Sequence, residues 1–262
     1  MRLFYTVMFL LVPILGVWTF AIADDYGWWF PENISSFGGE IDRLFDVIMY
    51  MVGFTFIGTE VLLAWCILRY SDKSPGKAVF SHGNHKLELL WTAVPALALL
   101  FIAFSQMGTW ADIKYAGSFP DGEYSVERPI AQVYASQFDW RVRYPDEEGN
   151  FQGTDVIESP FDFVVPVNTD VVFRLRSRDV LHSFFVPQLR LKQDAVPGMD
   201  IPVWFRAEEA GEYDIICAEL CGWGHYKMAG RLRVLEPDDY ETWLADQRVA
   251  LYTNGTEDRE DV

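Results

Sequence analysis

Basic residues, cysteine and histidine are all scarce in this sequence. Its 262 residues include 21 basic and 38 acidic side chains, three cysteines and four histidines. A net charge of -17 repels nucleic acid and speeds encounters with basic partners, which excludes nucleic-acid binding. The same charge would also serve solubility alone, and composition does not separate these two readings. No Cys-x-x-Cys-His motif occurs, which excludes a covalently attached c-type haem.

Long hydrophobic runs are confined to the first 110 residues. Residues 1–23 carry one positive charge at Arg2, then an apolar stretch and an Ala-x-Ala ending, which are the marks of a secretory signal peptide. The run is also long enough to serve as an N-terminal membrane anchor. Both interpretations stay open at this point. Either one leaves residues 24–43, which are polar and rich in Gly and Pro, as a segment on the outer surface.

Residues 44–110 predict a transmembrane helical hairpin. The runs 44–68 and 87–107 are each long enough to cross a bilayer once. The basic residues around the connecting loop are Arg69, Lys73, Lys77 and Lys86. Positively charged loops stay on the cytoplasmic side of a membrane. We therefore expect a multi-pass protein of the bacterial inner membrane, with this loop inside and the rest of the chain on the periplasmic side.

Two polar or reactive residues lie within the predicted crossings. Glu60 is deep in the first crossing, where a carboxylate is costly and often functional. The alternative is that Glu60 only faces a polar patch of a partner subunit. Cys66 stands alone near the cytoplasmic end of the same run, where a cysteine behaves as a small buried hydrophobe.

From about residue 130 the pattern changes to that of β-strands. After a linker at residues 111–129, short β-branched and aromatic runs alternate through residues 130–236, separated by Gly, Pro, Asp and Asn. Because no helices intervene, this pattern favours an antiparallel sandwich of two sheets, in the Greek-key cupredoxin form with a metal in its end loops. Residues 237–262 follow as a C-terminal helix and an acidic tail, beginning with Pro237 and acidic residues.

One short segment concentrates the metal-binding side chains. Between Asp214 and Met228 the spacing is Cys-x3-Cys-x3-His-x2-Met, and an upstream segment supplies a second imidazole. These five side chains are Cys217, Cys221, His225, Met228 and His182. Thiolate, imidazole and thioether are soft or borderline ligands, which select copper over magnesium or calcium. A blue-copper site needs only one cysteine, so the second cysteine and histidine indicate two metals bridged by two sulfurs.

Two other interpretations use part of the same set. Cys217 and Cys221 could form a disulfide, as a pair of cysteines in an exported domain often does. Two cysteines and two histidines could also hold a tetrahedral zinc ion. Zinc has no need of Met228, however, and usual zinc spacings place the cysteine pair and the histidine pair farther apart.

The segments CAELCGWGHYKM and DVLHSF together resemble the binuclear copper (CuA) motif of cytochrome c oxidase subunit II, of the bacterial aa3-like haem-copper oxidase family. The resemblance extends over about residues 44–243 and implies a cupredoxin fold. It also implies a copper pair bridged by both cysteines, with one histidine on each copper. The implied copper ligands are His182, Cys217, Glu219 (through its backbone carbonyl), Cys221, His225 and Met228. The side chain of Glu219 is implied as a ligand of a magnesium ion shared with subunit I, which suits an ion that is held by few carboxylates.

The resemblance implies further roles outside the copper motif. Glu88, in HKLELLWTAVPA, matches the glutamate at the cytoplasmic entrance of the K proton pathway, although a carboxylate at a helix start is also favoured by the helix dipole. Many relatives carry Trp at the position of Phe138, where electrons from cytochrome c enter. Here Phe138 or Trp140 would take that role, and the alternative for both is core packing. The acidic residues expected to dock a basic cytochrome c are Asp146, Glu147, Glu148 and Asp179.

The expected protein is the electron-input subunit of a terminal respiratory oxidase, with no substrate pocket of its own. It would accept electrons from cytochrome c at the copper pair and pass them to haem in subunit I, where oxygen is reduced to water. Subunit III is a further expected partner. The alternatives are the CuA subunit of a nitric oxide reductase and a copper-free structural subunit of a quinol oxidase, which would not need the intact ligand set. A periplasmic copper carrier is disfavoured by the two membrane crossings and Glu88.

Overall fold

The computed structural model describes residues 1–70, 76–77, 80–153 and 155–260, and Lys73 of the predicted loop therefore lies outside the described residues. The chain forms two compact units. One comprises residues 1–30 and 40–108, and the other comprises residues 31–39 and 109–262. We refer to them as the helical unit and the sandwich unit.

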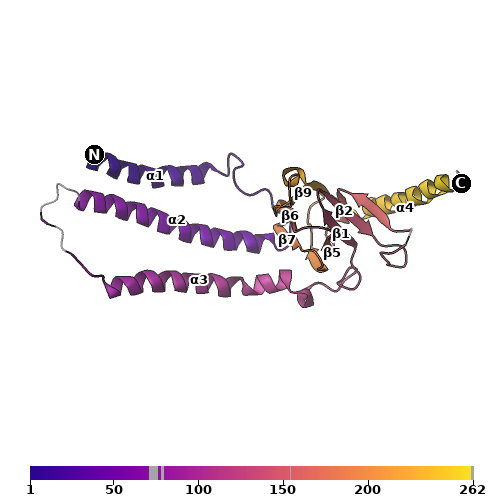
Figure 1. Cartoon of the computed structure of the whole chain (residues 1–262), viewed down its shortest axis with the longest axis horizontal. Helices are drawn as coiled ribbons and strands as arrows, with labels where there is room; N and C mark the ends of the chain where they lie inside the picture. Colours follow the sequence, from indigo (N-terminus) through magenta and orange to yellow (C-terminus); the bar gives the residue numbers. More distant parts are fainter. Residues whose placement is uncertain (71–75, 78–79, 154, 261–262) are drawn as a thin grey trace. The chain divides into compact units, whose positions relative to one another are not determined.

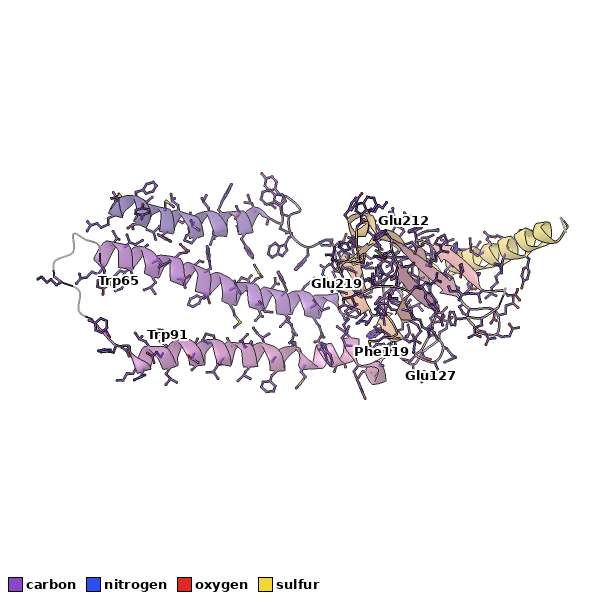
Figure 2. All side chains as sticks on the ribbon, in the orientation of Figure 1. Trp65, Trp91, Phe119, Glu127, Glu212 and Glu219 are labelled. Atoms are coloured by element: carbon purple, nitrogen blue, oxygen red, sulfur yellow. The ribbon has the colours of Figure 1, made fainter. Side chains whose placement is uncertain are left out.

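The helical unit contains three long apolar helices, α1 (Arg2–Ile22), α2 (Gly38–Arg69) and α3 (His85–Lys114). By length and composition each could cross a membrane, with mean hydropathies of 2.1, 1.9 and 2.1. Only 11%, 6% and 0% of these apolar windows are buried. Their side chains project outward all along the helices, as Trp65 and Trp91 do in Figure 2. The three runs expected from the sequence are therefore helical, and α2 and α3 extend beyond the apolar runs at both ends.

The sandwich unit consists of two five-stranded sheets (Figure 1). In order across the first sheet, the strands are β3 (Ile157–Pro160), β2 (Asp139–Tyr144), β1 (Ala131–Ser136), β5 (Val171–Ser177) and β8 (Ile201–Phe205). In order across the second sheet, they are β4 (Asp162–Pro166), β10 (Ala229–Leu235), β9 (Gly211–Cys217), β6 (His182–Val186) and β7 (Leu191–Ala195). The fold class expected from the sequence, transmembrane helices followed by a β-sandwich of the cupredoxin type, is confirmed.

The expectation that the sheets are wholly antiparallel is wrong for two strand pairs. β1 runs parallel to β5, with Ala135 opposite Ser177, and β10 runs parallel to β4, with Leu232 opposite Phe163. In both cases the chain has crossed to the other sheet between the two strands, so the returning strand need not reverse direction as it does in a hairpin. Alternation of side chains reports which face of a strand is buried, and it carries no information about the direction of the neighbouring strand.

The core between the two sheets is rich in aromatic side chains. Phe163, Phe173 and Phe184 are fully buried, with ring centroids 5.3 Å apart for Phe163–Phe173 and 5.2 Å for Phe173–Phe184. Edge-on and tilted packing of this kind adds to the free energy gained from burying the rings. Trp140 continues the cluster toward the end of the sandwich, 5.6 Å from Phe184. The ends of the strands are thus held on a rigid base.

A segment from before α2 completes the sandwich unit. Ile34 donates its N–H to the carbonyl of Gln188 at 3.0 Å and accepts from the N–H of Glu208 at 2.8 Å. Its side chain is 2% exposed, and that of Phe37 is 8% exposed against Trp204. Part of the segment expected only to lie on the outer surface is therefore an integral element of the sandwich.

Three short helical elements and one longer helix complete the described chain. They are the 3-10 helices η1 (Ala116–Ser118), η2 (Pro187–Leu189) and η3 (His225–Lys227), and the helix α4 (Pro237–Glu260). As expected from the sequence, α4 starts at Pro237 with acidic residues in its first turn. Its Trp243 packs against Tyr144, with ring centroids 5.0 Å apart, which joins the start of α4 to the sandwich.

Candidate metal centre

The loop between β9 and β10, residues 218–228, is closed by backbone hydrogen bonds where it leaves the sheet. The N–H of Cys217, the last residue of β9, donates to the carbonyl of Met228 at 3.1 Å. The N–H of Ala218 donates to the carbonyl of Ser183 in β6 at 3.0 Å. β6 and β9 are paired, with Phe184 opposite Cys217. The loop and the start of β6 therefore form one rigid corner of the sandwich, which we call the ligand corner.

Three sulfur atoms meet inside this corner. Cys221 Sγ lies 3.9 Å from Cys217 Sγ and 3.7 Å from Met228 Sδ. The carbonyl oxygen of Glu219 lies 3.2 Å from Cys217 Sγ. The two cysteines are each 4% exposed and Met228 is 1% exposed. A disulfide requires sulfur atoms about 2.05 Å apart, so the cysteines are free thiols here.

Each of the two histidines faces one of the cysteines. His182, at the start of β6, is fully buried and places Nδ1 3.9 Å from Cys217 Sγ. His225, in η3, places Nδ1 3.6 Å from Cys221 Sγ. The other ring nitrogen of His182 lies 2.8 Å from a carboxylate oxygen of Asp179. If Nε2 carries the proton that it donates to Asp179, Nδ1 presents a lone pair to the sulfurs, which is how ligating histidines are commonly oriented.

Asp179 is held as an anion beside His182. Burial opposes its ionisation, but hydrogen bonds from His182 and from the N–H groups of Gln137 and Val180 outweigh this and lower the pKa of Asp179. The two N–H contacts measure 2.7 Å from Gln137 and 2.6 Å from Val180. Asp179 thus orients the imidazole ring of His182. The sequence alone did not predict this role.

The thiol of Cys221 resists ionisation in the absence of a cation. Burial raises the pKa of Cys221 to about 11, and the neighbouring Cys217 contributes because a second negative charge nearby is unfavourable. A metal that binds the thiolate form must therefore displace a proton from Cys221. Such a site takes up metal with release of protons, so its apparent affinity depends on pH.

The turn between β1 and β2 packs onto the ligand loop. The side-chain amide of Gln137 donates to the carbonyl of Cys221, and the ring of Phe138 lies against the loop backbone. A Cβ atom added to Gly224 would lie 2.6 Å from Cγ of Phe138, and one added to Gly222 would lie 2.6 Å from Nε2 of Gln137. Both glycines are needed for this close approach. Gln137, which links Asp179 to Cys221, was missed from the sequence because a lone glutamine in a turn carries no recognisable signal.

Other residues singled out from the sequence are placed as follows. Trp140 is fully buried, 6.4 Å from His182 between ring centroids. A donor therefore cannot touch Trp140 directly, which favours the alternative of core packing, and its electron-entry role stays a prediction. Phe138 is partly exposed and stays a candidate. Glu219 is also partly exposed, and Figure 2 labels it at one end of the sandwich.

The predicted docking carboxylates are not brought together. Asp179 belongs to the ligand corner, whereas Asp146, Glu147 and Glu148 follow the end of β2 remote from the Gln137–Phe138 turn, roughly 17 Å along the strand at ~3.3 Å per residue. Glu147 instead lies 3.8 Å from Arg248 of α4. In the helical unit, Glu88 lies in the first turn of α3 with its carboxylate 2.9 Å from His85 Nδ1.

The residues of the ligand corner fit copper by their donor chemistry. Among the described residues, His182, Cys217 and Cys221 form a buried group whose ligand atoms all lie within 4.8 Å of one another. His225 and Met228 add an imidazole and a thioether beside Cys221. This mixture of sulfur and nitrogen donors, with no carboxylate oxygen among the side chains, matches the preference of copper and excludes magnesium and calcium.

Comparison with known proteins identifies the family. Residues 134–234 match the model of "Cytochrome C oxidase subunit II, periplasmic domain", and residues 23–108 match that of "Cytochrome C oxidase subunit II, transmembrane domain". The chain is 30% identical to cytochrome c oxidase subunit 2 of Thermostichus vulcanus, over 81% of this chain and 76% of the relative. The chain belongs to the cytochrome c oxidase subunit II family.

A second curated relative agrees with that family. This subunit II is 30% identical to cytochrome c oxidase subunit 2 of Cereibacter sphaeroides, over 85% of this chain and 81% of the relative. Among solved structures it is similar to the periplasmic domain of subunit II of cytochrome oxidase of Bradyrhizobium japonicum, at 26% identity and a TM-score of 0.41, over 46% of this chain and 94% of that one. The protein is thus a membrane-anchored electron-input subunit of an oxidoreductase complex.

Proposed function

We propose that this subunit II holds a pair of copper ions in the ligand corner and receives electrons there from cytochrome c. The observation that carries the proposal is the convergence of two thiols 3.9 Å apart, each with its own imidazole Nδ1 within 3.9 Å. The proposed ligands are His182, Cys217, the Glu219 carbonyl, Cys221, His225 and Met228. A copper pair bridged by two thiolates would supply a site at which two ions share one electron.

The protein's own residues prepare this site before any metal arrives. The neck of the loop is closed by the hydrogen bond between Cys217 and Met228, and the ring of His182 is oriented by Asp179. Ligands already held in place need little movement when the charge at the site changes, and burial keeps water from reorganising around them. A single blue-type copper or zinc would leave part of this donor set unused.

The partners follow from the family. We propose that electrons pass onward to haem in subunit I, where oxygen is reduced to water, and that subunit III belongs to the same complex. The Glu219 side chain is proposed to hold magnesium at the contact with subunit I, in keeping with an ion that needs few protein carboxylates. Asp179 and the remote carboxylates of residues 146–148 are proposed to attract a basic cytochrome c, the latter only at long range.

The membrane arrangement is proposed from charge. Arg69 ends α2 and Lys86 begins α3, so positive side chains stand at the same end of both helices. By the positive-inside rule this end is cytoplasmic. The sandwich unit, which follows the other end of α3, is then periplasmic in a multi-pass protein of the bacterial inner membrane.

Copper content and electron spin resonance of the purified complex test the metal proposal. We expect two coppers per chain in this subunit and one unpaired electron delocalised over both ions. A spectrum localised on one copper, or zinc in place of copper, would contradict it. Oxygen consumption with reduced cytochrome c, compared with nitric oxide consumption, separates an oxidase from a nitric oxide reductase.

Glu88 is proposed to admit protons from the cytoplasmic side. Glu88→Gln should slow steady-state turnover by about tenfold or more, in the range that loss of a proton-transfer group costs. Reduction of the copper pair by cytochrome c should stay unchanged, because it requires no proton from that side. Wild-type turnover in this variant would contradict the proton-transfer role. Glu88 would then serve only as a carboxylate at the start of α3, which the helix dipole favours.

A further inference from the structure

Large apolar side chains are exposed in the segments that carry the copper ligands. They are Val180, Leu181, Ile216, Leu220, Trp223 and Tyr226. Three of them are at least 77% exposed, and all three lie on the ligand loop or in η3. Clustered exposed apolar side chains in a folded domain mark a surface that meets a partner. Other large apolar side chains are exposed among the described residues of the sandwich unit, such as Tyr115 and Met199, but each of them by 64% or less.

Trp223 is the largest member of this cluster. It is 79% exposed, although it is separated from Cys221 and from His225 by a single glycine on each side. Its contacts are with its own loop: the Tyr226 ring lies 6.5 Å away edge-on, and Lys227 Nζ lies 5.2 Å from the ring centroid. Lys227 thus covers one face of the indole. An indole so exposed contributes little to the core of the sandwich.

The two aromatic residues that the sequence analysis proposed for electron entry are less accessible to a donor than Trp223. Trp140 is fully buried. Phe138 is only partly exposed and lies against Gly222 and Gly224, the two glycines that flank Trp223. Phe138 therefore supports the loop backbone on which Trp223 stands. The indole combines exposure to solvent with a covalent connection, through a single glycine on each side, to two proposed copper ligands.

We propose that Trp223 is the residue that the electron donor touches and through which electrons reach the ligand corner. This inference rests on the proposed function, and it names the point of contact for the proposed donor. One electron would leave the donor haem, whose iron would pass from ferrous to ferric, and a copper pair held by the proposed ligands would accept it. No bond forms or breaks, and no proton moves.

The partner that fits this surface is a small basic haem protein with an exposed haem edge. The centre of the surface is apolar and aromatic, and tryptophan is among the residues that most often dominate binding at such centres. This part of the chain as a whole is negative: from residue 111 onward the sequence has 29 acidic and 15 basic residues, a net of -14. Asp179, an anion of the ligand corner, lies beside the Gln137–Phe138 turn. A flat porphyrin edge ringed by lysines complements both features.

The test compares variants in the assembled oxidase. In Trp223→Ala, the second-order rate of electron transfer from reduced cytochrome c, and its binding affinity, should fall by about 30-fold, as loss of a dominant contact does. Reduction by a small neutral dye and the copper spin resonance spectrum should match those of the wild type. Trp223→Phe should recover most of the rate, since an aromatic ring remains at the contact. Tyr252→Ala, which removes an exposed aromatic ring from α4, is the matched control and should stay within about threefold of the wild type, and Phe138→Leu should lose less of the rate than Trp223→Ala.

Several outcomes would overturn the proposal. A wild-type rate in Trp223→Ala would do so, as would a larger loss in Phe138→Leu. Loss of the copper spectrum or of co-purifying haem subunit in both Trp223 variants would show a structural or subunit contact instead. If wild-type protein is reduced by the dye but not by cytochrome c, the proposed donor itself is wrong. If wild-type protein accepts electrons from cytochrome c and Trp223→Ala does so equally well, only the assignment of Trp223 fails.

Discussion

The helical unit and the sandwich unit differ in how much of their hydrophobic surface is buried within the chain. In α1, α2 and α3 at most 11% of each apolar window is buried within the chain, whereas the sandwich buries Phe163, Phe173 and Phe184 completely. Lipid or partner subunits must therefore cover these apolar side chains. The backbone groups of the helices need no such partner, because their hydrogen bonds are made within each helix. The sandwich has a core of its own and needs no cover to hold its ligands. The chemistry of the protein should thus be separable from its anchorage.

The sharpest test of that contrast uses one cysteine from each unit. Cys217→Ser should abolish the mixed-valence optical and spin resonance signals completely, because a hydroxyl does not replace a bridging thiolate. Cys66→Ser, the matched change in α2, should leave both signals unchanged. Spectra of the purified variants check this. A normal spectrum in Cys217→Ser, or a lost one in Cys66→Ser, would break the separation.

A second comparison concerns stability. Phe184→Ala removes a fully buried ring from the sandwich core and should lower its free energy of unfolding by ~3–5 kcal/mol. Phe54→Ala, at a site 81% exposed on α2, should change the unfolding of the sandwich by less than ~0.5 kcal/mol. Denaturant titration in detergent, followed by near-ultraviolet circular dichroism, gives both values. Equal losses would mean that the two units unfold together.

Residues 31–39 are the part of the sandwich that comes from before α2. A soluble fragment beginning at residue 109 lacks Ile34 and Phe37, and should be less stable by roughly 2–4 kcal/mol, the value of burying two such side chains less the cost of ordering the segment. Adding a peptide of residues 31–39, or fusing it to the fragment, should restore the lost stability. The midpoint of thermal unfolding with and without the peptide measures this. No response to the peptide would assign the segment to the helical unit instead.

The smallest expected effect is the pH dependence of one ion-pair cluster at the edge of the sandwich. Hydrogen bonds from Arg174, together with Arg176, lower the pKa of Asp200 below its usual value of 3.8. A lowered pKa adds stability above pH ~4 that is lost as the pH falls below it. Because the side chain is 33% exposed, Asp200→Asn should cost only ~0.5–1 kcal/mol at pH 7.

That small difference should shrink steadily as the pH falls below ~4 when unfolding of the wild type and Asp200→Asn is compared down to pH 2. A constant difference across the pH range would mean that the carboxylate acts through packing rather than charge. Asp200 joins the start of β8 to β5 within the first sheet. A measurable effect would therefore show that charge as well as core packing supports the sandwich.

Sequence alone determined the parts of this protein that depend on composition and spacing. Apolar runs long enough to cross a bilayer, such as 44–68, can be recognised in the sequence, because the length of a helix is proportional to its number of residues. Cys217, Cys221, His225 and Met228 lie so close together along the chain that almost any compact loop brings them near one another. Strand alternation likewise indicated a two-sheet sandwich.

The tertiary structure alone decided which residues far apart in the chain lie next to one another. The parallel pairing of β1 with β5, the return of residues 31–39 to the sandwich and the bond from Gln137 to Cys221 have no local signature. Burial of Trp140 and exposure of Trp223 were equally invisible, because both are tryptophans in short polar contexts and only packing separates them. Local spacing specifies which side chains can bind a metal. The three-dimensional packing of the sandwich specifies which of the surrounding residues a partner can reach.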